Sequence, residues 1–286
     1  MAKNYSLRLA ACVMTVAGLV AFGAHQAAAQ KKSLVIKGSD TLVNLSQAWA
    51  EAYMKKNPDA QISVTGGGSG VGISAFLNGS ADIANASREM SGAELQKAKE
   101  KGFIAQATTC ALDGLAIAVN SANPVTKLSV PDLAKIYTGG ASDWSQVGGG
   151  GGRIIALSRE TSSGTYVYFR DEVLGGKNYR PDALLMPSTK AIATELARNP
   201  RAIGYGGEAY FRGKAGIKVV PVSKKPGGQA IAPTDETVRN KTYPIARPLY
   251  MYTPGKPTGL AAAFIKFTLS PEGQQIVKQV GYTPIK

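Results

Sequence analysis

The sequence predicts an α/β fold with a largely parallel sheet, and two observations carry this prediction. Short runs of β-branched and other apolar residues alternate with segments whose apolar residues recur at helical spacing. Glycine- and serine-rich turns repeatedly join a run of the first kind to a segment of the second, which is the order of a βαβα chain. Hydrophobic residues make up 44% of the 286-residue chain, enough for a sizeable core.

The first segment of the chain has the pattern of a secretory signal peptide. Lys3 and Arg8 precede an apolar stretch from Leu9 to about Gly23, and Ala27-Ala28-Ala29 offers an A-x-A cleavage site. A transmembrane helix needs about 20 apolar residues, and this stretch is shorter and rich in alanine. We therefore expect residues 1–29 to be removed and the protein to be exported.

The next elements follow the expected alternation. A strand at 34–36 precedes a helix from about Leu42 to Lys56, which Pro58 ends. The apolar positions of this helix lie at helical spacing: Leu42, Leu45, Trp49, Ala52 and Tyr53. A strand at 62–65 and a helix at 71–77, stopped by Asn78-Gly79, complete the first two βα units.

The rest of the chain continues the pattern less regularly. Helices are expected near 92–101, at 131–137 with proline in the first turn, at 190–198 and over 264–280. Strands are expected at 115–119, 154–157, 203–205 and 217–222. The glycine run 148–152 is expected to form a loop, either a flexible linker or a tight surface turn.

The residues left after cleavage exclude most hydrolytic chemistry. Removal of residues 1–29 takes away Cys12 and the only histidine, His25, so the mature chain keeps one thiol, Cys110. A disulfide framework is excluded, as are Ser-His-Asp and Cys-His catalysis and zinc sites built on histidine. We therefore expect no enzyme, no catalytic residues, no metal site and no cofactor.

The charge of the chain favours anionic partners. The whole sequence has 33 Lys and Arg against 19 Asp and Glu, and only two of the basic residues lie in the leader. The lysines are scattered, and the longest basic runs are the pairs Lys31-Lys32 and Lys224-Lys225. We expect no nucleic-acid binding, because there is no basic stripe with interleaved aromatic residues. A basic protein that binds a surface polymer stays as an alternative.

Three turns between a strand and a helix offer anion-binding geometry. They span 37–41, 66–70 and 159–165, and each combines glycine with serine or threonine. The first turn of a helix has unpaired N–H donors and a partial positive charge, so it holds anions. Arg88 and Arg159 lie near these turns and could add planar forks for paired oxygens.

A small tetrahedral anion needs many such donors at once. Hydrogen bonds to charged groups contribute roughly 1.5–3 kcal/mol each, whereas micromolar binding requires about 8 kcal/mol net. Each turn alone could be an ordinary helix cap, and each arginine alone could be a solvated surface residue. Together the turns and arginines could supply the number of donors that such an anion needs.

Four segments carry a resemblance to a known family. Residues 38–42, 67–70, 84–88 and 159–165 resemble, in order and spacing, the ligand loops of the periplasmic phosphate-binding proteins of ABC importers. The R-x-x-x-S-G-T pattern of the last segment is the most specific of them. The resemblance implies the fold of type II periplasmic binding proteins, which is α/β with two lobes and a ligand cleft between them. It also implies a phosphate ligand, partnership with the membrane permease subunits of an importer, and a monomer.

Carried over residue by residue, the resemblance implies a set of phosphate-binding positions. The set comprises Ser39, Asp40, Thr41, Leu42, Ser69, Gly70, Ser87, Arg88, Arg159, Ser163, Gly164 and Thr165. The chain departs from the family at Arg88, where well-known members place an aspartate that accepts the phosphate proton. Arginine cannot accept a proton, so Asp40 becomes the candidate acceptor, with a simple helix cap as the other reading.

The lobes are expected to be discontinuous in sequence. Extended segments at 110–119 and 245–252 flank the middle of the chain, which suits two hinge crossings. We expect one lobe from residues 31–117 plus 248–286 and the other from residues 118–247.

Other readings of the sequence remain. Residues 70–75 match G-x-G-x-x-A after a strand, as in dinucleotide-binding enzymes, but the acidic residue expected about 20 positions later is missing. An exported phosphatase would need histidines or clustered carboxylates for metal. Within the binding class, sulfate, molybdate or an organophosphate are alternative ligands, since helix N-termini suit any tetrahedral oxyanion.

Overall fold

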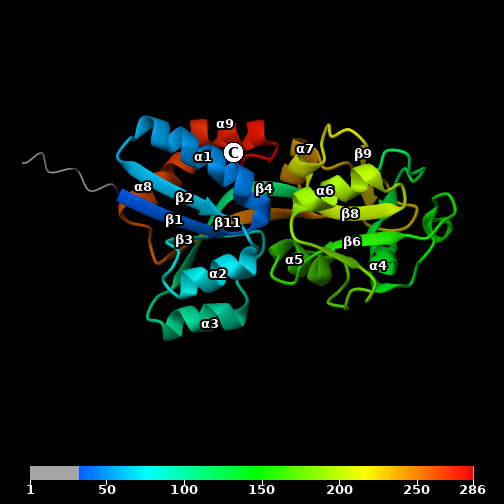
Figure 1. Ribbon diagram of the computed structural model, residues 1–286, viewed down its shortest axis with the longest axis horizontal. Helices are drawn as coiled ribbons and strands as arrows, with labels where there is room; N and C mark the ends of the chain where they lie inside the picture. The colour runs from blue at the N-terminus through cyan, green and yellow to red at the C-terminus, as the bar shows by residue number, and fades with distance from the viewer. Residues whose placement is uncertain (1–31, 286) are drawn as a thin grey trace, which may run out of the picture. The chain divides into compact units, whose positions relative to one another are not determined.

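The computed structural model describes residues 32–285, so the predicted signal peptide lies outside the described residues. Among the described residues, no helix is both long and apolar enough to cross a membrane. Strands and helices alternate over most of this part of the chain, which confirms the predicted α/β class (Figure 1).

The strands form one sheet in the order β2-β1-β3-β11-β4-β8-β6-β7, with β9 paired to β4. Their bounds are β1 Lys32–Gly38, β2 Ala60–Thr65, β3 Ile83–Ala86, β4 Ala105–Asn120, β6 Ile155–Arg159, β7 Leu184–Met186, β8 Ala202–Gly207, β9 Ile217–Val220 and β11 Ala246–Pro254. A separate pair joins β5, Leu128–Ser129, to β10, Val222–Ser223.

The sheet is mixed, so the prediction of a largely parallel sheet was only half right. β1 pairs in parallel with β2 and β3, and β6 pairs in parallel with β7 and β8. The antiparallel pairs of the described sheet all involve β4 or β11, which pair with each other and with β3, β8 and β9. The βαβ units are therefore parallel as expected, and two long strands that run against them connect the units.

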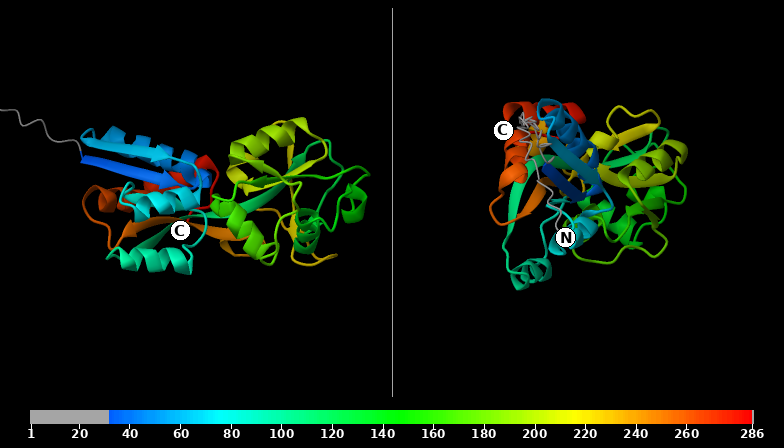
Figure 2. Two further views of the ribbon diagram at one scale, coloured as in Figure 1. Left: turned by 60° about the horizontal axis from the view of Figure 1, so that its bottom comes forward. Right: turned by 60° about the vertical axis from the view of Figure 1, so that its left-hand side comes forward.

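Helices cover both faces of the sheet. Their bounds are η1 Asp40–Leu42, α1 Val43–Lys56, α2 Ser69–Leu77, α3 Gly92–Glu100, α4 Val130–Thr138, η2 Trp144–Val147, α5 Gly164–Glu172, α6 Thr189–Arg198, η3 Glu208–Tyr210, α7 Asp235–Arg239, α8 Gly259–Thr268 and α9 Pro271–Val280. In the β1, β2 and β3 region, α1, α8 and α9 share one buried cluster, and α2 and α3 share another (Figure 2). β3 contributes to both clusters, with Ile83 in one and Ala84 and Ala86 in the other, which explains why all four of its residues are buried.

The buried side chains fall into groups that match two stretches of sequence. Two clusters draw on residues 34–111 and 249–282, and two others draw on residues 115–245. β4 contributes to both groups: Cys110 and Ala111 belong to the first, and Leu115, Ile117 and Val119 to the second. β4 is 16 residues long, far longer than the predicted strand at 115–119.

Candidate anion-binding site

Five hydroxyl side chains meet at the ends of separate elements, and we call them the hydroxyl cluster: Ser39, Thr41, Ser69, Ser87 and Thr165. All five are buried. Thr41 Oγ1 and Thr165 Oγ1 lie 3.0 Å apart, and Ser39 Oγ donates to Ser87 Oγ at 3.0 Å. Ser87 Oγ is also 3.4 Å from Ser69 Oγ and 3.5 Å from Thr165 Oγ1. Buried hydroxyls that can satisfy one another in this way form a polar site inside the protein.

Four of these hydroxyls lie at the starts of helical segments, and the fifth, Ser87, directly follows β3. Ser39 precedes η1, which contains Thr41 and runs directly into α1. Ser69 is the first residue of α2, and Thr165 is the second residue of α5. Because helix N-termini expose unpaired amides, the cluster lies where the partial positive charge of several elements converges.

Glycine is required at the start of α5. A Cβ added to Gly164 would lie 2.2 Å from Ser69 Oγ and 2.9 Å from Ser87 Oγ. Ser163, the N-cap of α5, accepts from the amides of Thr165 and Tyr166. The S-G-T order therefore places a cap, a close approach and a cluster hydroxyl on three consecutive residues.

An arginine that the sequence reasoning missed reaches the hydroxyl cluster. Arg247, on β11, donates from Nη2 to Thr165 Oγ1 at 3.0 Å and from Nη1 to the carbonyl oxygen of Ser87 at 3.0 Å. It also donates from Nε and Nη2 to Asp113 Oδ2, at 3.0 and 2.9 Å. The guanidinium carbon lies 5.0 Å from the centre of the Tyr168 ring, a distance that allows a cation–π contact.

Arg247 and Asp113 form an ion pair in the middle of the sheet. Their side chains are 2% and 1% exposed, and the two residues are register partners across β11 and β4. Burial raises the pKa of the Asp113 carboxyl above its ordinary value, although the nearby Arg247 acts in the opposite direction. The signal that could have revealed the pair is the presence of one charge of each sign in the two segments predicted to cross between lobes.

The predicted residues Asp40 and Arg159 contact each other. Arg159 Nη1 lies 3.2 Å from Asp40 Oδ2 and donates to Thr189 Oγ1 at 3.0 Å. Its Nε and Nη2 donate to the carbonyl oxygens of Met186 and Pro187. The side-chain contacts of Arg159 thus go to Asp40 and to the segment 186–189. Its direct contact with an anion stays a prediction.

Arg88 contacts different residues from those that its neighbour Ser87 contacts. Its guanidinium makes two hydrogen bonds to the carboxylate of Glu94, at 2.7 and 2.8 Å, and a third to the carbonyl oxygen of Glu89. Burial would raise the pKa of Glu94, but hydrogen bonds from Arg88 and from the Ser91 amide lower it overall. Glu94 also completes the capping box of α3 with Ser91, so Arg88 is held at the start of that helix. At this loop it is Ser87 that joins the hydroxyl cluster.

The predicted backbone donors are engaged within the protein. The amide of Leu42 donates to the carbonyl oxygen of Ser39 at 3.0 Å, and the amide of Gly70 donates to that of Ser162 at 2.9 Å. Of the residues predicted from the sequence, the structure therefore brings five hydroxyls together, with Ser163 and Gly164 beside them in sequence. It places Asp40 with Arg159, and Arg88 with Glu94.

The described residues hold no group of three or more histidine, cysteine, aspartate or glutamate side chains that could bind a metal. The hydroxyl cluster, the helix starts and Arg247 instead offer donors that suit an oxyanion.

Comparisons with known proteins agree with this chemistry. The profile of the PBP superfamily domain matches residues 23–272. The phosphate-binding protein PstS of Pseudomonas aeruginosa is 34% identical over 265 residues, which cover 87% of this chain and 81% of that protein. Protein SphX of Synechococcus elongatus is 31% identical over 292 residues, which cover 98% of this chain and 86% of that protein.

Solved structures are similar over nearly the same length. An ABC-type phosphate transport receptor from Vibrio cholerae has a TM-score of 0.71 and 30% identity, covering 87% of this chain and 99% of that chain. A protein from Clostridium perfringens, assigned as a phosphate ABC transporter substrate-binding protein and solved with bound phosphate, has a TM-score of 0.80 and 30% identity. That match covers 89% of this chain and 100% of the other.

Proposed function

The chain belongs to the PBP superfamily and, within it, to the phosphate-binding proteins of ABC importers, and we propose that it captures inorganic phosphate between two lobes and delivers it to an importer. Family members are solute-binding transport proteins and not enzymes. The observation that carries the proposal is the buried hydroxyl cluster with Arg247 against it, at the starts of three helical segments.

We place the phosphate at the hydroxyl cluster. The ligand would separate hydroxyls that now bond to one another and would accept hydrogen bonds from them, from the freed helix amides and from Arg247. We count Ser39, Thr41, Ser69, Ser87 and Thr165 as the side-chain contacts, with Leu42, Gly70, Ser163 and Gly164 as candidate backbone contacts. Arg247 replaces Arg88 as the cation nearest the ligand, because its Nη2 already bonds to Thr165 Oγ1.

The charge balance of the site bears on selectivity. Asp113 offsets Arg247 and Asp40 offsets Arg159, so affinity depends mainly on hydrogen bonds and helix dipoles rather than on net charge. A hydroxyl can accept a hydrogen bond as well as donate one, so a serine or threonine of the cluster can accept the proton of monohydrogen phosphate. Sulfate carries no proton at neutral pH, so it cannot donate a hydrogen bond to such a hydroxyl. We therefore expect phosphate to be preferred over sulfate.

The buried clusters support the two lobes predicted from the sequence, one of residues 31–117 plus 248–286 and the other of residues 118–247. Side chains from 34–111 and 249–282 pack together, and those from 115–245 pack separately. β4 and β11 then form the crossings between lobes. We propose further that the protein works in the periplasm as a monomer, after removal of residues 1–29, and binds no nucleic acid.

Calorimetry tests the function directly. Titration of the purified protein without residues 1–29 should show one phosphate per chain, with weaker binding of sulfate and molybdate at the same pH and ionic strength. Binding of sulfate or molybdate in preference to phosphate would contradict the proposal, as would no binding of phosphate. Hydrolysis of a simple phosphate ester by the same preparation would contradict the assignment as a pure binding protein.

A further inference from the structure

We propose that Asp40 is a positioning residue that latches the two lobes together, and that it acts on affinity through closure and not through contact with the anion. The proposal rests on the function proposed above. It also replaces the reading of Asp40 as acceptor of the phosphate proton.

Both contacts of the Asp40 carboxylate, and one contact of its carbonyl oxygen, reach the lobe of residues 118–247. Its Oδ2 accepts from the amide of Thr189 at 2.9 Å and lies 3.2 Å from Arg159 Nη1. Its carbonyl oxygen accepts from the hydroxyl of Tyr210 at 3.0 Å. Asp40 itself belongs to the other lobe, so three bonds cross between lobes at one residue.

The partners of the carboxylate form an anion-binding geometry of their own. Thr189 is the first residue of α6, a helix of 10 residues, so its amide has no acceptor within the helix. Arg159 is buried beside it and already donates to Thr189 Oγ1. A helix N-terminus and a buried guanidinium both favour a negative charge, and Asp40 supplies that charge from the opposite lobe. If the lobes opened, the N-terminus of α6 and Arg159 would both lose this negative charge.

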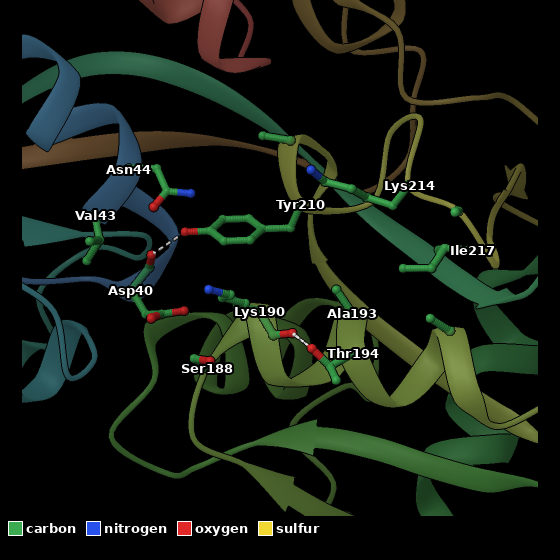
Figure 3. Close-up of a pocket in the computed structure, with 13 residues that line it drawn as sticks. Asp40, Val43, Asn44, Ser188, Lys190, Ala193, Thr194, Tyr210, Lys214 and Ile217 are labelled. Carbon is green, nitrogen blue, oxygen red and sulfur yellow. Dashed lines mark hydrogen bonds between the residues drawn. The ribbon is translucent and has the colours of Figure 1, made fainter.

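The position of Asp40 separates it from the ligand chemistry. The neighbouring Thr41 directs its hydroxyl to Thr165 in the hydroxyl cluster, whereas Asp40 Oδ2 takes two donors outside that cluster. Asp40 and Tyr210 line a groove of about 600 Å³ that Ser188 and Lys190 also border. Figure 3 shows the Tyr210 ring reaching toward the backbone of Asp40 in this groove. None of the five residues of the hydroxyl cluster lines this groove.

A second set of contacts crosses between the same lobes without charge. The amide of Gly70 donates to the carbonyl oxygen of Ser162 at 2.9 Å, and Ser162 Oγ donates to the carbonyl oxygen of Gly67 at 3.3 Å. These neutral contacts, one between backbone groups and one from the Ser162 side chain, join the glycine turn to Ser162. Asp40 is the residue at which the carboxylate, a helix N-terminus and a buried arginine meet, so its removal is the informative change.

The test compares anions as well as affinities. Asp40→Ala removes both carboxylate contacts, and Asp40→Asn keeps an acceptor for the Thr189 amide but loses the charge paired with Arg159. We expect the dissociation constants of phosphate and sulfate to rise by the same factor. That factor should be about 10- to 100-fold for alanine, as for loss of a charge-assisted hydrogen bond, and smaller for asparagine. Tyr210→Phe should raise both constants equally and by less.

The matched control is Asp82→Asn, because Asp82 Oδ2 accepts from the amide of Val35 within one lobe. It should leave both dissociation constants unchanged. An Asp40 variant that alters the phosphate-to-sulfate ratio would overturn the latch, because that result requires contact with the ligand. Unchanged constants for both anions would overturn it too.

Small-angle scattering separates the latch from the proposed function. In the absence of phosphate, Asp40→Ala should have a larger radius of gyration than the parent, since closure no longer gains the contacts with Thr189 and Arg159. Equal radii would overturn the latch whatever the protein binds. Failure of the parent to bind phosphate would overturn the proposed function, and the ligand-free scattering would still decide the latch.

Discussion

At the scale of single residues, the main charged feature beside the hydroxyl cluster is the buried ion pair of Arg247 and Asp113. Taking two charges out of water is expensive, and a hydrophobic replacement of such a pair is often no less stable. The pair is therefore better explained by the donors that Arg247 directs at Ser87 and Thr165 than by stability. Asp113 accepts two hydrogen bonds from this guanidinium, which holds it in place and balances its charge.

The first prediction is that Arg247 contributes more to phosphate binding than any other side chain. Arg247→Met should weaken binding by roughly 2–5 kcal/mol, the cost of removing one partner of a buried charge pair. Arg247→Lys should also bind poorly, because a point charge cannot reach Asp113, Ser87 and Thr165 together. Titration calorimetry measures both variants.

Two other arginines provide the comparison for Arg247. Arg153→Met is the control, since the side chain is 69% exposed and pairs with Asp182 at the surface, so phosphate affinity should not change. Arg159→Ala should weaken phosphate and sulfate equally, through loss of its bond to Asp40. A loss for Arg159→Ala that is specific to phosphate, with Arg247→Met near the parent, would reverse the assignment.

The sequence predicted the hydroxyls better than the charges. Ser39, Thr41, Ser69 and Thr165 were predicted because helix starts are visible in the local pattern of glycine, serine and threonine, and Ser87 was predicted through the resemblance of residues 84–88. Arg247 and Asp113 are 134 positions apart and meet only through the register of β4 and β11. Local patterns carry no information on that register, and they also could not show that Arg88, predicted together with Ser87, pairs with Glu94 instead.

At the scale of elements, the glycine turn before α2 sets how closely two loops approach. Gly68, the N-cap of α2, has a φ of 103°, and a Cβ added there would lie 2.6 Å from the carbonyl oxygen of Ser162. Glycine meets both demands, the left-handed backbone and the close contact. The turn therefore depends on glycine for closure as well as for its own shape.

The second prediction uses Gly68→Ala with Gly79→Ala as its control. Gly79 also has a positive φ, 72°, but nothing lies within 4 Å of an added Cβ. Both variants should lose about 1–2 kcal/mol of stability from backbone strain. Gly68→Ala alone should weaken phosphate binding, because it pushes Ser162 away. Chemical denaturation and calorimetry measure the two effects, and equal affinities for the two variants would contradict the prediction.

Elements with a clear period were predicted closely. The expected helices at 71–77 and 190–198 correspond to α2, Ser69–Leu77, and α6, Thr189–Arg198. The second half of β4 was predicted, as an extended segment at 110–119, but its start at Ala105 was missed because the first half is mixed in exposure and shows no clear period. β7, Leu184–Met186, was missed because a strand of three residues has too few positions to show a pattern.

At the scale of the whole molecule, the antiparallel pairing of β4 with β11 ties the two groups of buried clusters together. Two strands side by side allow bending about one line while keeping the lobes joined. The third prediction is that saturating phosphate reduces the radius of gyration measured by small-angle scattering. An unchanged radius at saturation would contradict closure around the ligand, and sulfate at the same concentration gives the comparison.

The path of the chain through the first lobe also sets the order in which the protein can fold. Cys110, on β4, donates its thiol to the carbonyl oxygen of Leu249 at 3.3 Å, and its own carbonyl oxygen accepts from Gln274 on α9. The core that surrounds it includes Phe264 and Val277, so it cannot close until α8 and α9 have been synthesised. The core around Cys110 is therefore completed only after the whole stretch from β4 to α9 has been made.

Cys110, the one cysteine among residues 32–285, reports that last step. Burial raises the pKa of Cys110 to about 12, so the folded protein should resist alkylation at neutral pH. A chain that stops at residue 258 lacks α8 and α9 and should leave Cys110 open to the reagent, even with β1 to β4 present. Rapid alkylation of Cys110 in the folded full-length protein would contradict this prediction, because the core around Cys110 would then open while the rest of the protein stays folded. If Cys110 is protected from alkylation in the full-length chain but not in the shortened one, then α8 and α9 are the segment that completes its core.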